Sequence, residues 1–80
     1  MDTLTAVQRR LIEICQEKRW SFNAVAHYAG IPSSTMKNIL SGKSQNPRIV
    51  TIKKICDGLD ISLADFFDTE AFRTLEQEIK

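Results

Sequence analysis

The stretch of sequence that decides the fold is FNAVAHYAGIPSSTMKNILSGK, residues 22–43. Its first part has small and apolar residues at helical spacing, at Val25, Ala26 and Ala29. Ser21, just before it, is a residue type that caps helix N-termini, and Gly30 is the type that ends helices in the left-handed conformation. The pattern predicts a short helix over residues 22–29.

A second helix is predicted directly after the first, over residues 33–41. Ile31 suits a buried position in the turn, and Pro32 is favoured in the first turn of a helix. Apolar residues then recur at intervals of three and four positions, at Met36, Ile39 and Leu40, before Gly42 ends the segment. Two helices joined by a tight, glycine-containing turn form a helix-turn-helix unit.

Further helices are predicted on both sides of this unit. A helix ending near Lys18 has apolar spacing at Leu4, Val7, Leu11, Ile14 and Cys15, and Thr5 with Gln8 resembles a capping box at its start. After the unit, Asn46 and Pro47 fit the start of a helix with an apolar stripe at Ile49, Ile52, Ile55, Cys56 and Leu59.

A fifth, short helix is predicted to end near Asp68, because Ser62 followed by Asp65 resembles a capping box. Its apolar residues, which would close the core, are Leu63, Phe66 and Phe67. The sequence thus predicts an all-α fold, with a compact five-helix domain in residues 1–68.

The extension, residues 69–80, is predicted to add a C-terminal amphipathic helix. Its apolar residues recur at helical spacing, at Phe72, Leu75 and Ile79, and Glu76 and Lys80 form an i, i+4 pair. A five-helix core does not need this stripe. It is therefore a candidate dimer contact, with folding back onto the chain's own core as the alternative.

Charges are distributed unevenly, although the formal net charge is only +1. Residues 18–56 hold seven Lys and Arg and no Asp or Glu, whereas residues 57–80 hold seven Asp and Glu. A surface that faces phosphates requires such a segment, because a carboxylate there would repel the polyanion. The alternative is an ordinary patchy surface.

The remaining chemistry favours binding over catalysis. Cys15 and Cys56 lie far apart, and His27 is the only histidine, so neither a zinc site nor a nucleophile with its base is apparent. Both cysteines are expected to be buried apolar residues. We expect no enzyme activity, no metal, no cofactor and no membrane segment, and a cytoplasmic location.

These features resemble the phage repressor and Cro family, also called the XRE family. The resemblance rests on residues 22–43 and on SGKSQNPRIVTIKKICDGLDISLADFF, residues 41–67, and it extends from about Val7 to Asp68. It implies a repressor-like DNA-binding domain that inserts the helix 33–41 into the major groove. Binding as a homodimer to an inverted-repeat operator is the assembly that the family favours.

The resemblance also implies which residues touch DNA. The base-reading candidates are Ser33, Ser34, Thr35, Lys37 and Asn38. Asn38 is suited to adenine and Lys37 to guanine, whereas the two serines have helix capping or phosphate contact as alternatives, and Thr35 is partly used in packing. The phosphate candidates are Ser21, Ser41, the Gly42 amide, Lys43 and Arg48.

Two positions depart from the family pattern. Phe22 stands where relatives often have a Gln that touches phosphate, and Leu40 stands where they often have a Glu paired with an Arg. We expect Phe22 and Trp20 to pack on the first helix, with contact to a sugar or a partner as the alternative. Arg9 or Arg10 would be free for phosphate.

The predicted function is that of a sequence-specific transcriptional regulator, a repressor of phage, mobile-element or antitoxin type. The antitoxin case would add a toxin as a partner, which the sequence does not identify. The alternative function is a protein-interaction module that kept the fold and no longer binds DNA. The segment without acids favours DNA.

Overall fold

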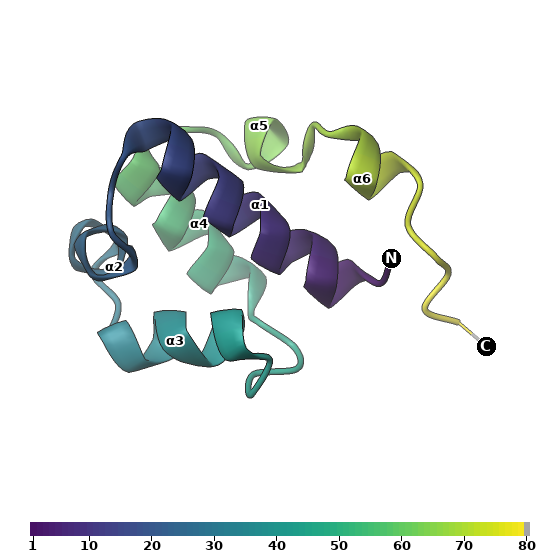
Figure 1. Cartoon of the computed structure of the whole chain (residues 1–80), viewed down its shortest axis with the longest axis horizontal. Helices are drawn as coiled ribbons and strands as arrows, with labels where there is room; N and C mark the ends of the chain where they lie inside the picture. Colours follow the sequence, from purple (N-terminus) through teal and green to yellow (C-terminus); the bar gives the residue numbers. More distant parts are fainter. Residues whose placement is uncertain (80) are drawn as a thin grey trace.

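Six helices make up the structure, which is a computed structural model that describes residues 1–79. They are α1 (Thr3–Lys18), α2 (Phe22–Ala29), α3 (Ser33–Ser41), α4 (Ile49–Leu59), α5 (Leu63–Phe67) and α6 (Glu70–Arg73), and the described residues include no strand. In Figure 1, α3 lies along one edge of the molecule and α5 and α6 lie along the opposite edge, with α1 and α4 between them. The predicted all-α fold is confirmed.

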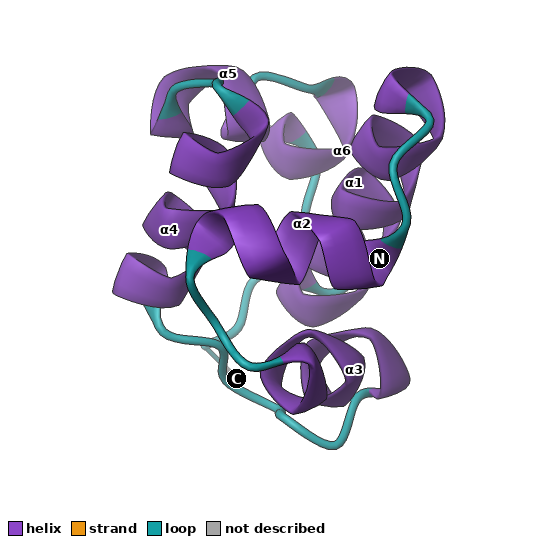
Figure 2. Ribbon diagram, turned by 90° about the vertical axis from the view of Figure 1, so that its left-hand side faces the viewer, coloured by secondary structure: helices purple, strands orange, loops and turns teal. Residues whose placement is uncertain are grey.

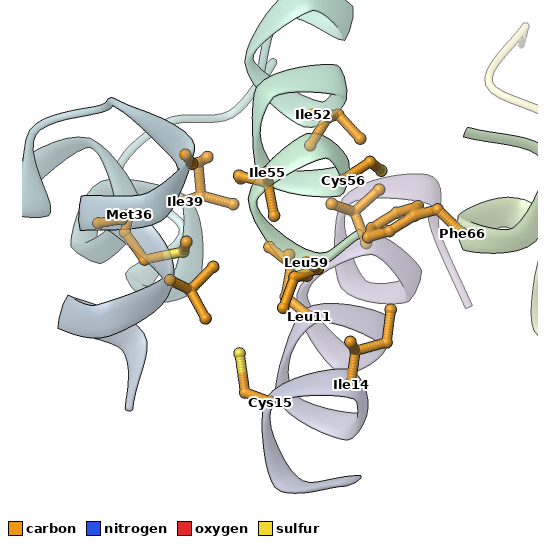
Figure 3. Packing of buried hydrophobic residues seen from close by; sticks show 14 residues of the cluster. Leu11, Ile14, Cys15, Met36, Ile39, Ile52, Ile55, Cys56, Leu59 and Phe66 are labelled. Atoms are coloured by element: carbon orange, nitrogen blue, oxygen red, sulfur yellow. The ribbon is translucent and has the colours of Figure 1, made fainter. Parts of the chain in front are cut away.

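The core is formed by one apolar side of each of the first four helices, and α5 adds an aromatic ring (Figure 3). Its completely buried residues include Leu11, Val25, Ile55, Cys56 and Phe66. The helical spacing of apolar residues in the sequence predicted these positions correctly. Cys15 and Cys56 are buried free thiols, as expected, and burial raises the pKa of both.

The turn between α2 and α3 has the predicted geometry, and Figure 2 shows α2 lengthwise with α3 beneath it. The Ser21 hydroxyl accepts a hydrogen bond at 3.1 Å from the backbone amide three residues later. Gly30 has a φ of +69°, and the Ile31 amide donates back to α2 at 3.1 Å. Pro32 then precedes α3, which begins at Ser33 as predicted.

Close packing between α2 and α4 depends on Gly58. A Cβ at this position would lie 2.8 Å from the Ala29 nitrogen and 2.9 Å from the Tyr28 carbonyl carbon. Both neighbours are backbone atoms, so they cannot move aside as a flexible side chain would. Glycine inside a helix has an entropic cost, and here its missing side chain lets the two helices approach. The sequence analysis did not identify this role.

The predicted start of α1 is wrong. The helix begins at Thr3, and Asp2 caps it, because the carboxylate accepts a hydrogen bond from the Thr5 amide at 2.8 Å. Gln8, the expected partner of Thr5, instead donates from Nε2 to the Ile39 carbonyl of α3 at 2.9 Å. A contact across the fold therefore takes this side chain away from the helix end.

The predicted start of α4 is also wrong, because the helix begins at Ile49 rather than at the Asn46–Pro47 pair. Arg48 occupies the N-cap position without a side-chain hydrogen bond. The preceding loop folds back onto α3, since the Ser44 amide donates to the Asn38 carbonyl at 2.9 Å. This hydrogen bond holds the residues before Arg48 in the loop.

The predicted C-terminal amphipathic helix exists only as the single turn α6. Phe72, from this turn, is half-buried, and its ring centroid lies 4.9 Å from that of Phe67 and 6.2 Å from that of Phe66. Leu75 and Ile79 follow in a segment that is not helical. The apolar spacing therefore overpredicted the helix, and Phe72 packs against the chain's own core.

The segment after α6 is attached to the start of α1. The Glu76 amide donates to the Met1 carbonyl at 3.3 Å, and the Glu76 carboxylate lies 3.5 Å from the N-terminal ammonium. Glu78 accepts hydrogen bonds from the Thr3 amide at 3.3 Å and from the Thr3 hydroxyl at 2.9 Å. Carboxylates are stabilising at a helix N-terminus. The predicted pairing of Glu76 with Lys80 lies outside the described residues.

Candidate nucleic-acid interface

The solvent side of α3 carries all five predicted base-reading residues. The helix buries Met36 and Ile39 against the core. We use the term α3 face for the residues on its other side, which are the exposed Ser33, Ser34 and Lys37 and the half-buried Thr35 and Asn38. Because residues three and four positions apart are neighbours on a helix, these side chains form one continuous surface.

The hydroxyl groups of Ser33 and Ser34 make no hydrogen bond within residues 1–79. The sequence left helix capping as one role for them, but Pro32 occupies the N-cap position of α3, and no side chain caps this helix. The Pro32 carbonyl accepts hydrogen bonds from the amides of Thr35 and Met36, at 3.0 and 3.4 Å. Both serine hydroxyls are thus available to an external partner.

Asn38 has a side-chain amide that makes no hydrogen bond to the described residues. Its backbone carbonyl, in contrast, accepts from the Ser44 amide at 2.9 Å and from the Ser41 hydroxyl at 3.4 Å. Lys37 likewise has no ion pair within the part of the chain that the structure describes. An amide can donate and accept at once, as adenine requires, whereas an ammonium only donates, which suits guanine.

The predicted phosphate contacts differ in what they can still donate. The Ser21 hydroxyl only accepts within the chain, so its proton remains available. The Gly42 amide donates to the Ile39 carbonyl at 3.2 Å, so the contact expected of this amide is not available in this conformation. Ser41 donates to the end of α3 and accepts from the Lys43 amide at 3.3 Å, and it therefore shapes the loop.

Lys43 and Arg48 supply the unpaired positive charges next to the α3 face. Both side chains are exposed, and neither has an acidic partner among residues 1–79. Lys53, in contrast, is paired with Asp57 on the same helix, which neutralises part of its charge. Because residues 18–56 include no carboxylate, nothing in this segment opposes the field of Lys43 and Arg48.

The two arginines that the sequence left free for phosphate have different roles. Arg10 donates from Nε to the Phe66 carbonyl at 2.7 Å and from Nη2 to the Asp65 carbonyl at 2.9 Å, and it pairs with Glu13. The expectation is therefore wrong for Arg10, since this side chain is used to hold the end of α5 against α1. Arg9 is exposed and has no partner among the described residues.

Phe22 and Trp20 are less buried than expected, with 38% and 37% of their surface exposed. The Trp20 ring lies 5.0 Å from that of Tyr28, measured between centroids. Phe22 instead borders a hollow of about 280 Å³ that Ser33 and Lys37 also line. Phe22 is the first residue of α2 and comes directly after the N-cap residue Ser21. This position at the start of the helix was the sequence signal for its exposure.

Residues 1–79 include no group of three His, Cys, Asp or Glu side chains that could hold a metal ion. No described helix is both long enough and apolar enough to cross a bilayer. The single histidine, His27, is exposed, and its ring meets the Tyr28 ring edge-on at 5.4 Å.

Comparison with known proteins gave two matches. The family model of the Cro/C1-type HTH DNA-binding domain matches residues 10–71. The chain is also similar to the protein in the crystal structure of the prophage Lp1 protein 11, with a TM-score of 0.81 and 36% sequence identity, over 94% of this chain and 100% of that chain. No curated protein matches the sequence. The family match includes the whole of α2, α3 and the loop that follows them.

Proposed function

The chain belongs to the Cro/C1-type helix-turn-helix DNA-binding domain family, and we propose that it is a sequence-specific transcriptional regulator that represses its target promoter. In this proposal α3, residues 33–41, is the recognition helix in the major groove. The observation that carries the proposal is the α3 face, whose polar side chains have no partner within residues 1–79. The prophage origin of the solved relative supports a phage or mobile-element context over an antitoxin operon.

Base recognition is assigned to the middle of the α3 face. The Asn38 side-chain NH2 would donate to adenine N7 while its amide oxygen accepts from the adenine N6 amino group. Lys37 would donate to guanine O6 or N7. The Ser33 and Ser34 hydroxyls discriminate less between bases, and they fit a base edge or a phosphate equally. Thr35 is half-buried, so it contributes at the border of this surface.

Phosphate contacts are assigned to both ends of the helix-turn-helix unit. Ser21, whose hydroxyl proton is available, precedes α2 in the sequence, and Lys43 and Arg48 follow α3. Ser41 and Gly42 act indirectly in this proposal, because their hydrogen bonds set the path of the loop that presents Lys43. Residues 57–80, which hold seven Asp and Glu, include α5 and α6, and these two helices lie on the edge opposite α3 (Figure 1). DNA, a polyanion, would therefore be attracted to the α3 edge and repelled by the α5–α6 edge.

We further propose a homodimer on an inverted repeat, because one recognition helix reads only a few base pairs. The half-site centres would lie about 34 Å apart. Of the three predicted dimer contacts, Phe72 packs in the chain's own core and Leu75 is half-buried, whereas Ile79 is 89% exposed. The proposed interface is therefore centred on Ile79.

Sedimentation of the variant Ile79→Asp tests the proposed interface. A buried aspartate would be unfavourable in an apolar contact, so the variant should be monomeric at concentrations where the original chain is dimeric. The control Gln77→Asp adds the same charge in the same segment. If Ile79→Asp still dimerises, the interface lies elsewhere on the molecule.

Selection from random duplex DNA tests the regulator itself. The original chain should enrich one sequence class, and a variant with Ser34, Lys37 and Asn38 changed to alanine should not. A matched control changes Glu70, Thr74 and Gln77 to alanine on the opposite edge, and it should enrich the same class. The selected site, placed over a promoter, should lower reporter expression. Failure to bind any duplex would contradict the proposal and favour a protein-interaction module.

A further inference from the structure

A small hollow lies between the N-terminal ends of α2 and α3, next to the α3 face. Its volume is about 280 Å³, and it is lined by Ser21, Phe22, Asn23, Ser33, Met36 and Lys37. Met36 is buried, whereas the other residues reach solvent. The hollow therefore opens beside the first residue of the proposed recognition helix, and it is lined by one aromatic ring.

That ring belongs to Phe22, and it differs from the other aromatic rings of the chain. Trp20 lies against Tyr28, and the three phenylalanines of the C-terminal half contact one another. Phe22 is 38% exposed and has no ring contact within residues 1–79. Exposed apolar surface is unfavourable in water, so this ring would gain from contact with an apolar ligand group.

The position of the Phe22 ring beside the start of α3 indicates which apolar group of DNA it could contact. In the major groove, the one apolar group that a base presents is the C5-methyl of thymine. Ser33 is small, so it leaves space beside the ring at the start of α3. We propose that Phe22 receives a thymine methyl group and thereby selects thymine at one position of the site. This inference rests on the proposed function, because it requires α3 to lie in the major groove.

Replacing thymine by deoxyuridine tests the proposal, because this change removes only the methyl group. Each thymine of the selected duplex is replaced in turn, and affinity is measured for the full chain. At one position of each half-site the replacement should weaken binding about fourfold, the effect of one buried methyl group. The same methyl on 5-methylcytosine, compared with cytosine at that position, should strengthen binding by a similar factor.

Variants then assign the effect to Phe22. In Phe22→Ala the deoxyuridine penalty should disappear, while in the control Tyr28→Ala, which removes a more exposed ring from the same helix, it should persist. Circular dichroism establishes that each variant is folded. If Phe22→Ala does not fold, Phe22→Gln replaces it, since this polar residue also removes the apolar contact.

The outcomes separate this inference from the proposed function. If the chain binds its duplex and no thymine shows a penalty, or if the penalty is unchanged in the Phe22 variant, the role of Phe22 is overturned and the regulator proposal stands. If the chain binds no duplex at all, both are overturned. A penalty at one thymine of each half-site that requires Phe22 supports both.

Discussion

Several polar side chains along the α5–α6 edge are paired within the chain, whereas the five side chains of the α3 face have no partner among residues 1–79. Arg73 pairs with Asp68 and Glu70, and Arg10 donates to two carbonyls of α5. The segment after α6 is tied to the start of α1 by two glutamates. The α3 face and the adjacent Lys43 and Arg48 have no such partners among residues 1–79.

The difference separates groups that stabilise the chain from groups that are available to a ligand. A paired group contributes to folding, and a ligand could use it only by breaking the pair. An unpaired exposed group is hydrated in the free protein and can exchange water for a partner. Mutations along the two edges should therefore change different quantities, stability on one and DNA affinity on the other.

The largest expected effect is the salt dependence of DNA binding. With about six phosphate contacts per dimer, affinity should fall by about 10³ between 50 and 200 mM salt, because counterions are released on binding. Lys43→Ala should lower the slope by about 1.8, since a dimer loses two contacts. Lys53→Ala is the control, because this lysine is already paired with Asp57. An affinity that does not depend on salt would contradict the assignment.

Arg10→Ala should have the largest effect on stability. It removes two charge-assisted hydrogen bonds to the end of α5, so the free energy of unfolding should fall by about 2 to 4 kcal/mol in urea titrations. Arg9→Ala, at an exposed neighbouring position without a partner among the described residues, should change it by less than about 0.5 kcal/mol. Equal stabilities of the two variants would show that Arg10 does not anchor α5.

Asn38→Ala, unlike Arg10→Ala, should change DNA affinity and leave stability nearly unchanged. Affinity for the preferred duplex should fall by about 1 to 3 kcal/mol, and selectivity should relax at one base position. Affinity for unrelated duplexes and the free energy of unfolding should stay nearly constant, because the amide makes no hydrogen bond to the described residues. If selectivity is unchanged, specificity arises elsewhere, for example from DNA deformability.

The smallest expected effect is at the C-terminal segment. Glu78→Ala removes an acceptor from the N-terminus of α1, so the melting temperature should fall by about 2 to 4 °C at low salt. The difference should shrink in 1 M salt, about the concentration at which such charges are screened. Gln77→Ala is the control. A lower DNA affinity in the Glu78 variant would contradict the separation of the two edges.

The helix-turn-helix unit could be predicted because its signals are local. Ser21, Gly30 and Ser62 act within a few residues of their own positions, and apolar spacing alone identified the buried sides of the helices. The five residues of the α3 face could be grouped for the same reason. Their contacts with DNA bases and phosphates stay predictions.

The errors in the sequence predictions arose where a side chain forms a hydrogen bond or ion pair with a residue far away in the sequence instead of with a local partner. Gln8 hydrogen-bonds to a residue 31 positions away, and Arg10 to one 56 positions away. Apolar spacing after Phe72 fits a helix, but it does not reveal that Glu76 and Glu78 bind the start of α1. Such competition between local and tertiary partners cannot be resolved from one sequence.

The absence of a side chain at Gly58 has a consequence for how the molecule can vary. The orientation of α2, and with it that of α3, depends on this contact with α4. In a library randomised at Gly58, folded members should retain glycine almost exclusively. A library randomised on the α3 face should instead yield many folded members with new sequence preferences. Gly58 would thus fix the packing of α2 on α4 beneath a surface whose side chains can vary without loss of the fold.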